Sequence, residues 1–112
     1  MTVTADDIRN TAALLHGQII RTPVLEAPML SRQFGCDLFL KMECLQHTSS
    51  FKARGALNAM IGLSAEQRKN GVIAMSAGNH AQAVAYHAER MGIPATIVMP
   101  AQTPFAKVAR TR

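Results

Sequence analysis

A lysine that follows a polar loop at the expected start of a helix is the first feature of this sequence that could do chemistry. Lys52 comes after Ser49, Ser50 and Phe51, and apolar residues at helical spacing predict a helix over residues 51–63. The positive end of a helix disfavours a second positive charge, so this position favours the neutral amine that Schiff-base formation requires. Taken alone, the segment fits a solvated lysine beside a capping serine equally well.

A second candidate is the turn of small and polar residues at 76–80. It follows the apolar run 72–75, which is typical of a buried parallel strand, and it precedes another predicted helix. Small residues let the backbone approach a ligand closely, and the first N–H groups of a helix bind anions. Open α/β sheets bind ligands at the carboxyl ends of their strands, where this turn lies. Taken alone, the segment is more simply interpreted as an ordinary turn with Asn79 as the helix N-cap.

The elements that must position these two segments alternate along the chain. Helices are expected from Thr4 to Gly17, from Pro28 to about Arg32, over 51–63, from Ser64 to Gly71, over the stripe of residues 81–88 up to Gly92, and near Phe105. Strands are expected at 37–45, 72–75 and 95–99, with an extended entry at 21–25. This order predicts an α/β fold, with an open, mostly parallel sheet and helices on both faces.

Composition excludes several classes of protein. The chain has 112 residues, of which 48% are hydrophobic and 17% charged, so it is long enough for one modest globular domain. The net charge of +5 reflects the lack of acidic residues after Glu89 and not a basic run, so we expect no nucleic-acid binding. The N-terminal residues lack the basic and apolar regions of a signal peptide, so we do not expect them to be one, and no apolar stretch approaches the roughly 18 residues that span a bilayer.

Neither the cysteines nor the histidines form a metal motif. Cys36 and Cys44 match no metal or disulfide pattern and are typical of reduced residues in a cytoplasmic protein. Only His80 and His87 share a face of one predicted helix, and they are too far apart to bind one ion. We therefore expect no metal site.

Taken together, the two candidate segments resemble the pyridoxal-phosphate-dependent family that contains threonine ammonia-lyase, serine dehydratase and serine racemase. The resemblance begins near residue 5, continues to the last residue, and looks nearest to bacterial threonine ammonia-lyases. It implies the fold-type II architecture related to the tryptophan synthase β subunit. The matching pieces are Arg21-Thr-Pro, Phe39-Leu-Lys-Met-Glu, Ser50-Phe-Lys, Arg54-Gly-Ala-Leu-Asn, Gly71-Val-Ile-Ala-Met-Ser-Ala-Gly-Asn-His-Ala-Gln and Val98-Met-Pro.

The resemblance assigns a role to each candidate residue. Lys52 would carry pyridoxal 5′-phosphate covalently and, once released by the substrate amine, would remove the Cα proton. Phe51 would pack against the cofactor ring, and Asn79 would hydrogen-bond its phenolic oxygen. Backbone N–H groups of the turn formed by Ser76, Ala77, Gly78, Asn79 and His80 would hold the substrate carboxylate.

Two departures from the family pattern concern these segments. Ser49 stands where many members have glycine or another small residue, and we expect it to be tolerated. Ala77 stands where racemases of the family have a serine that serves the opposite face of the substrate. The resemblance therefore implies dehydration of L-threonine or L-serine to a 2-oxo acid and ammonia, in preference to racemisation. A small amino-acid substrate and a homo-oligomeric full-length enzyme are the partners that it implies.

The largest departure is length, because members of the family are much longer than this chain. Nothing in the sequence resembles their glycine-rich phosphate-binding loop or the residue that contacts the pyridine nitrogen. We therefore expect residues 1–112 to be a truncated, N-terminal part of the catalytic domain that ends inside the smaller domain, with uncovered apolar faces and no activity in isolation. A catalytically inactive remnant and a serine racemase-like enzyme remain alternatives, and a nucleic-acid-binding module is a weak third.

Overall fold

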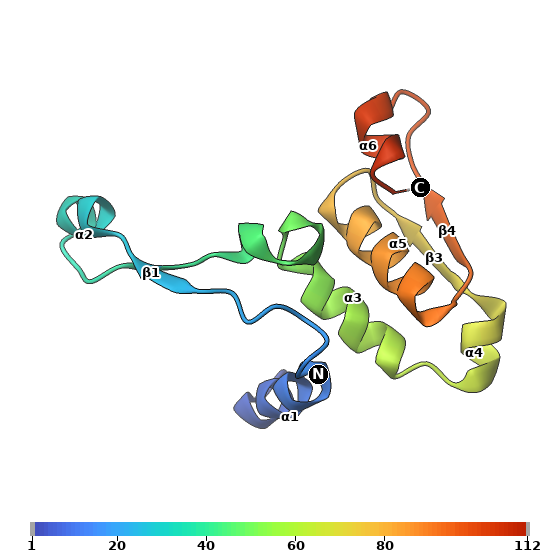
Figure 1. Cartoon of the computed structure of the whole chain (residues 1–112), viewed down its shortest axis with the longest axis horizontal. Coiled ribbons are helices and arrows are strands. Elements are labelled where there is room, and N and C mark those ends of the chain that lie inside the picture. The colour runs from blue at the N-terminus through green and yellow to red at the C-terminus, as the bar shows by residue number, and fades with distance from the viewer. Residues whose placement is uncertain (1, 112) are drawn as a thin grey trace.

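A computed structural model describes residues 2–111, whose helices and strands alternate along the chain within dimensions of 50 × 38 × 28 Å (Figure 1). The predicted α/β alternation is confirmed. The described elements are α1 (Ala5–Leu15), β1 (Val24–Glu26), α2 (Pro28–Phe34), β2 (Phe39–Lys41), the 3₁₀ turns η1 (Glu43–Leu45) and η2 (His47–Ser49), α3 (Lys52–Ile61), α4 (Ala65–Asn70), β3 (Val72–Met75), α5 (Asn79–Met91), β4 (Ala95–Val98) and α6 (Phe105–Ala109).

The strands form two separate pairs within the described residues. β3 and β4 are parallel, with Val72 opposite Ala95 and Met75 opposite Val98. The crossover between them is α5, as the sequence predicts for a βαβ unit. β1 and β2 pair in antiparallel fashion and, with α2, form an arm that projects away from the helices and the β3–β4 pair (Figure 1).

The core lies between α3, α5 and the β3–β4 pair. The predicted stripe of α3 is confirmed, because Ala53, Ala56, Leu57 and Met60 are all buried. The facing stripe of α5 includes Ala81, Val84 and Ala88, as predicted, and also Ala83 and His87, whereas the predicted member Ala85 is only half-buried. These small side chains let the two helices pack closely, so the position of one helix start fixes the position of the other.

Two helices begin with a complete capping box. Thr4 accepts a hydrogen bond from the backbone of Asp7, and the Asp7 side chain accepts one from the backbone of Thr4. Ser64 and Gln67 make the same reciprocal pair at the start of α4. Both starts were predicted from the sequence, and each satisfies N–H groups that have no partner within the helix.

The expected strand over residues 37–45 is wrong beyond Lys41. The chain turns instead into η1, where the Leu45 N–H donates to the Met42 carbonyl. The side chains of Glu43 and Gln46 bind residues 20–22 and 54, and these long-range bonds replace the strand ladder that the local alternation suggested.

The strand at 72–75 exists as predicted, but it is buried on one face only. Ala74 packs against α5, whereas Ile73 and Met75 are 78% and 83% exposed. Successive residues of a strand point to opposite faces, and nothing between residues 2 and 111 covers the second face. The expectation of uncovered apolar faces is thereby confirmed. None of the helices described between residues 2 and 111 combines the length and apolar character needed to cross a membrane.

Candidate functional site

Helix α3 begins at Lys52 without a side-chain cap. Its N-cap residue is Phe51, whose side chain makes no capping hydrogen bond. Ser50 does not act as the cap either, because its hydroxyl is buried and has no partner among the described residues. The interpretation of Lys52 as a solvated lysine is consistent with its exposure, but no serine caps the helix. The N–H groups of Ala53 and Arg54 donate instead to the carbonyls of Ser50 and Phe51.

Helix α5 also begins without a side-chain cap. Its N-cap is Gly78, and Asn79 is the first helical residue, so the interpretation of Asn79 as the N-cap is wrong. The turn before it is held at its base, because the Ser76 N–H donates to the Val98 carbonyl at 3.0 Å and the Ser76 hydroxyl accepts from the Gly78 N–H at 3.3 Å. The exposed side chains of Asn79 and His80 follow directly.

The turn η2 lies just before the start of α3 and packs against the middle of α5. It contacts both α3 and α5, and the two helices run in the same direction from the end where η2 lies (Figure 1). The His47 ring of η2 stacks on Tyr86 of α5 with ring centroids 5.1 Å apart. The start of α3, which carries Lys52, and the start of α5, which follows residues 76–78, therefore lie toward the same end of the core (Figure 1).

The loop before Lys52 is strained. Thr48 and Ser49 have φ values of 58° and 55°, in the left-handed region that costs a residue with a side chain about 1–2 kcal/mol. A glycine would adopt this conformation without that cost. The hydroxyls of Thr48 and Ser50 are buried without a partner, which is a further local cost. Such strain persists only where the surroundings impose it.

Phe51 and Lys52 lie beside each other on the surface. The Phe51 ring is 59% exposed, and the Lys52 Nζ atom lies 5.1 Å from its centroid. A large aromatic side chain at a helix start, next to an exposed amine, has lost the burial that would normally stabilise it. Phe34, Phe39 and Phe105 are exposed to a similar or greater degree, so the neighbouring amine, and not the exposure, is what distinguishes Phe51.

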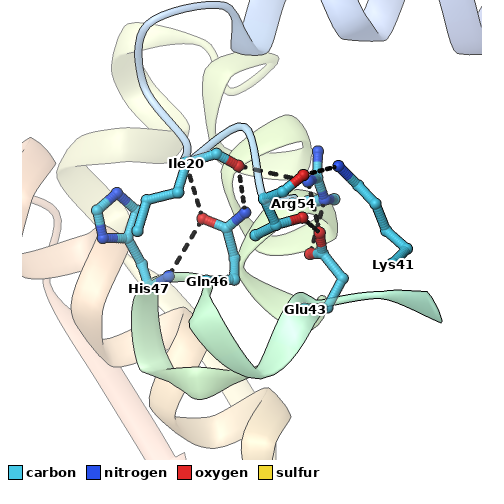
Figure 2. Close-up of polar contacts among 7 residues, drawn as sticks. Ile20, Lys41, Glu43, Gln46, His47 and Arg54 are labelled. Carbon is cyan, nitrogen blue, oxygen red and sulfur yellow. Dashed lines mark hydrogen bonds and ion pairs between the residues drawn. The ribbon is translucent and has the colours of Figure 1, made fainter. Parts of the chain in front are cut away.

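A polar network beneath α3 was missed by the sequence analysis. Both carboxylate oxygens of Glu43 accept from Arg54, at 2.8 Å from Nε and 2.6 Å from Nη2, and one also accepts from the Thr22 hydroxyl (Figure 2). The hydrogen bonds and the charge of Arg54 lower the pKa of Glu43 to about 2. The motif pieces Lys41-Met-Glu43 and Arg54 were visible in the sequence, but nothing local indicated that they pair.

Gln46 extends this network to the segment before β1. Its amide accepts from the Ile20 N–H at 2.9 Å and donates to the Ile20 carbonyl at 2.8 Å, while its oxygen also accepts from the His47 N–H (Figure 2). Lys41 adds a hydrogen bond from its ammonium group to the Thr22 carbonyl. The residues that lead into Lys52 are therefore tied to a distant stretch of backbone.

Two hollows lie near these elements. The larger, of about 750 Å³, lies between α1, residues 16–21 and α3, and it is lined by the side chains of Arg21, Lys41 and Arg54 among apolar residues of α1. The smaller, of about 370 Å³, lies beside α5 and β4 and includes Thr48 and Tyr86. Neither of these hollows is lined by Lys52, Phe51 or Asn79. Across residues 2–111, no three His, Cys, Asp or Glu side chains gather as metal ligands would.

The sequence from residue 15 to residue 112 matches the family model described as "Pyridoxal-phosphate dependent enzyme". The chain belongs to this family. The resemblance on which the sequence analysis relied is thereby confirmed, together with the fold class and the dependence of the family on pyridoxal phosphate. The architecture is that of the fold-type II enzymes.

Relatives with different names are similarly close. The chain is 49% identical over 110 residues to the L-threonine ammonia-lyase of Thermotoga maritima, covering 98% of this chain and 27% of that protein. It is 44% identical over 109 residues to the serine racemase of Schizosaccharomyces pombe, covering 97% and 34%. Among solved structures, maize serine racemase superposes with a TM-score of 0.90 at 40% identity, covering 99% of this chain and 34% of that one. The chain thus spans about a third or less of the relatives it matches.

Proposed function

We propose that the complete protein carrying this chain is a pyridoxal-phosphate-dependent ammonia-lyase that converts L-threonine or L-serine to a 2-oxo acid and ammonia. The observation that carries the proposal is the pair of uncapped starts of α3 and α5 at the same end of the core (Figure 1). One start presents the exposed amine of Lys52, and the other leaves backbone N–H groups free to bind an anion. Family membership supports the cofactor, and the names of the relatives leave the substrate open.

The residues at the start of α3 suit the cofactor of the family. Lys52 would hold it covalently and, when released, would accept the Cα proton of the substrate on Nζ. Phe51 offers an exposed ring beside that amine, and the buried Ser50 and Thr48 hydroxyls lack partners on this side of the loop. When bound, pyridoxal phosphate would spread the negative charge formed at Cα into its ring.

The start of α5 suits the substrate carboxylate. Residues 76–80 combine a glycine N-cap with the first N–H groups of the helix, and no side chain satisfies those groups. These groups would orient the substrate, and the Asn79 amide would hydrogen-bond the cofactor from the same helix start. Ser76 would keep the turn in place through its bond to β4.

Ala77 favours dehydration over racemisation. A racemase needs an acid or base on each face of Cα, and a methyl side chain can neither donate nor accept a proton. The likeness to serine racemases makes racemisation the second candidate function. The test is to measure 2-oxobutanoate formed from L-threonine and D-serine formed from L-serine by the complete gene product. We expect dehydration to exceed racemisation and Ala77→Ser to raise the racemase share; racemisation at an equal or higher rate would refute the assignment.

The remaining parts of the proposal concern the whole protein. We propose that residues 1–112 form the N-terminal part of a longer catalytic domain and end inside its smaller domain, and that the full-length enzyme is a cytoplasmic homo-oligomer acting on a small amino acid. Because no phosphate-binding loop is recognisable here, the 112-residue chain alone should not turn over L-threonine. Turnover by the isolated chain at the rate of the complete protein would contradict this expectation.

A further inference from the structure

We propose that Glu43 and Gln46 are positioning residues for Lys52, a role that rests on the function proposed above. Neither residue is placed at the start of α3 or α5. Both act through the loop and the helix turn that carry the lysine, and Figure 2 shows the Gln46 amide against the Ile20 backbone and the Glu43 carboxylate against Arg54. The strained turn at Thr48 and Ser49 lies between their two points of attachment.

The first attachment is to α3 itself. Arg54 follows Lys52 by two positions, and side chains of a helix turn by about 100° per residue, so the two project in directions about 200° apart. Pinning Arg54 therefore fixes the rotation of the first turn and the direction in which Lys52 points. The fork of two hydrogen bonds to Glu43 resists both rotation and sliding, which a single contact would not.

Glu43 is itself held from the opposite side. It accepts from the Thr22 hydroxyl, and Thr22 is 2% exposed, so the carboxylate cannot follow Arg54 if the helix moves. The side chains of Glu43 and Arg54 are 17% and 33% exposed. A pair so shielded and so fully hydrogen-bonded differs from the solvated Arg9–Asp6 pair of α1, whose side chains are 75% and 82% exposed.

The second attachment lies before the strained turn. Gln46 is 4% exposed and makes both hydrogen bonds that a strand partner of Ile20 would make. The same amide oxygen accepts from the His47 N–H, so the direction of the chain is set where η2 begins. Residues 47–51 must then connect two fixed points, and this constraint accounts for the left-handed conformation of Thr48 and Ser49.

The test uses the complete gene product and pyridoxal phosphate alone, without substrate. Glu43→Gln keeps the size of the side chain but removes its charge, and Gln46→Leu removes both amide bonds. Asp6→Asn is the matched control, because it breaks a 2.7 Å ion pair with Arg9 far from the loop. Ile93→Val controls for lost stability, since it removes one buried methylene from the core. The readouts are cofactor affinity by absorbance titration, the pH dependence of the bound-cofactor spectrum, amide exchange at residues 48–54, and the melting temperature.

We expect Glu43→Gln and Gln46→Leu to weaken cofactor affinity by about tenfold or more, as the loss of hydrogen bonds to a charged or buried group implies. Both should also shift the pH at which the spectrum changes and speed exchange at residues 48–54. Asp6→Asn should alter none of these, and Ile93→Val should lower only the melting temperature. If the wild type binds cofactor at Lys52 and the two variants bind it with unchanged affinity and spectrum, the positioning role is refuted. If the wild type binds no cofactor at Lys52, the proposed function fails instead.

Discussion

Helices α1 and α4 begin differently from helices α3 and α5. The first two are closed by capping boxes, in which Thr4 and Ser64 take up backbone N–H groups. The second two begin at Phe51 and Gly78, which supply no capping side chain. A cap stabilises a helix by about 1 kcal/mol, so an uncapped start in a packed core gives up stability. At α5 it leaves the first N–H groups of the helix without a side-chain partner, whereas at α3 those of Ala53 and Arg54 donate to the Ser50 and Phe51 carbonyls.

A missing side-chain cap does not by itself mark a site, because α2 and α6 also begin without one and carry no candidate residue. The capped helices have low burial and carry no candidate residue, whereas α3 and α5 pack against each other and hold Lys52 and Asn79. Strain follows the same division, since Thr48 and Ser49 adjoin an uncapped start. Local rules are broken where the proposed chemistry lies, as expected of a functional site.

Replacing the lysine of an uncapped helix should have the largest effect. We expect Lys52→Ala to abolish the label left on the complete gene product by borohydride reduction with pyridoxal phosphate, because no other amine would be held at that site. Lys69→Ala is the control, since Lys69 lies in the capped helix α4. Peptide mapping of the wild type gives the decisive result: a label on Lys41, Lys69 or Lys107 would refute the assignment.

Installing a cap on α5 should weaken binding and strengthen folding together. A Cβ at Gly78 would meet nothing within 4 Å, so a side chain fits there. In Gly78→Asp, the carboxylate would take up the free N–H groups, stabilise the helix by about 1 kcal/mol, and repel a substrate carboxylate. We expect KM for L-threonine to rise by about tenfold or more. Gly78→Ala adds the Cβ without an acceptor; an equal rise in KM there would indicate crowding and not capping.

The capped starts could be predicted from the sequence because a capping box is a local pattern. Thr4 and Asp7, and likewise Ser64 and Gln67, are three residues apart, and their bonds depend on nothing else. The order of elements and the buried stripe of α3 follow from equally short spacings. Fold class and the two candidate segments were accessible for this reason.

The long-range hydrogen bonds that hold the segment around the start of α3 could not be predicted in the same way. Gln46 binds Ile20 across 26 positions and Glu43 binds Arg54 across 11, and nothing in either neighbourhood indicates its partner. The strand expected over residues 37–45 failed for the same reason. Its local alternation favoured a strand, but the hydrogen bonds of Glu43 and Gln46 that override it are made to residues distant in the sequence. The exposure of Ile73 and Met75 likewise depends on what lies across the sheet, which hydrophobicity does not reveal.

Acid should lower the free energy of unfolding through a group in α5 and not through one in α3. His87 of α5 is fully buried, and neither ring nitrogen has a hydrogen-bond partner among the described residues. Burial, with the positive charge of Arg90 and a contribution from His47, lowers its pKa below the ordinary value of 6.5. The unfolded chain therefore takes up this proton first as the pH falls. The free energy of unfolding should decrease below about pH 6.5 and level off only below the lowered pKa of the folded state.

Urea unfolding between pH 7.5 and pH 5 measures this effect. His87→Met should flatten the pH dependence, because it removes the titrating ring and keeps an apolar side chain of similar size. His16→Met replaces an exposed histidine at the end of α1 and should leave the dependence unchanged. Glu43 contributes little in this range, because the stability that its lowered pKa provides is lost only as the pH falls below the unfolded-state value of 4.5 toward about 2. An unchanged slope in His87→Met would show that another group carries the acid sensitivity.

Removing the side-chain cap of α4 should have the smallest effect, and that effect should be confined to stability. Ser64→Ala deletes the acceptor of the Gln67 N–H and should lower the free energy of unfolding by about 1 kcal/mol. Ser64→Gly should lower it by only a few tenths of a kcal/mol, because glycine leaves the freed N–H accessible to water. Neither change touches the network of Glu43 and Gln46, so affinity for pyridoxal phosphate should stay within about twofold of the wild type, as expected of independent sites. Urea midpoints and cofactor titrations on the same samples test both statements. A loss of affinity in Ser64→Ala comparable to that of Glu43→Gln would mean that capped and uncapped starts share one cooperative unit, and the functional distinction between them would not hold.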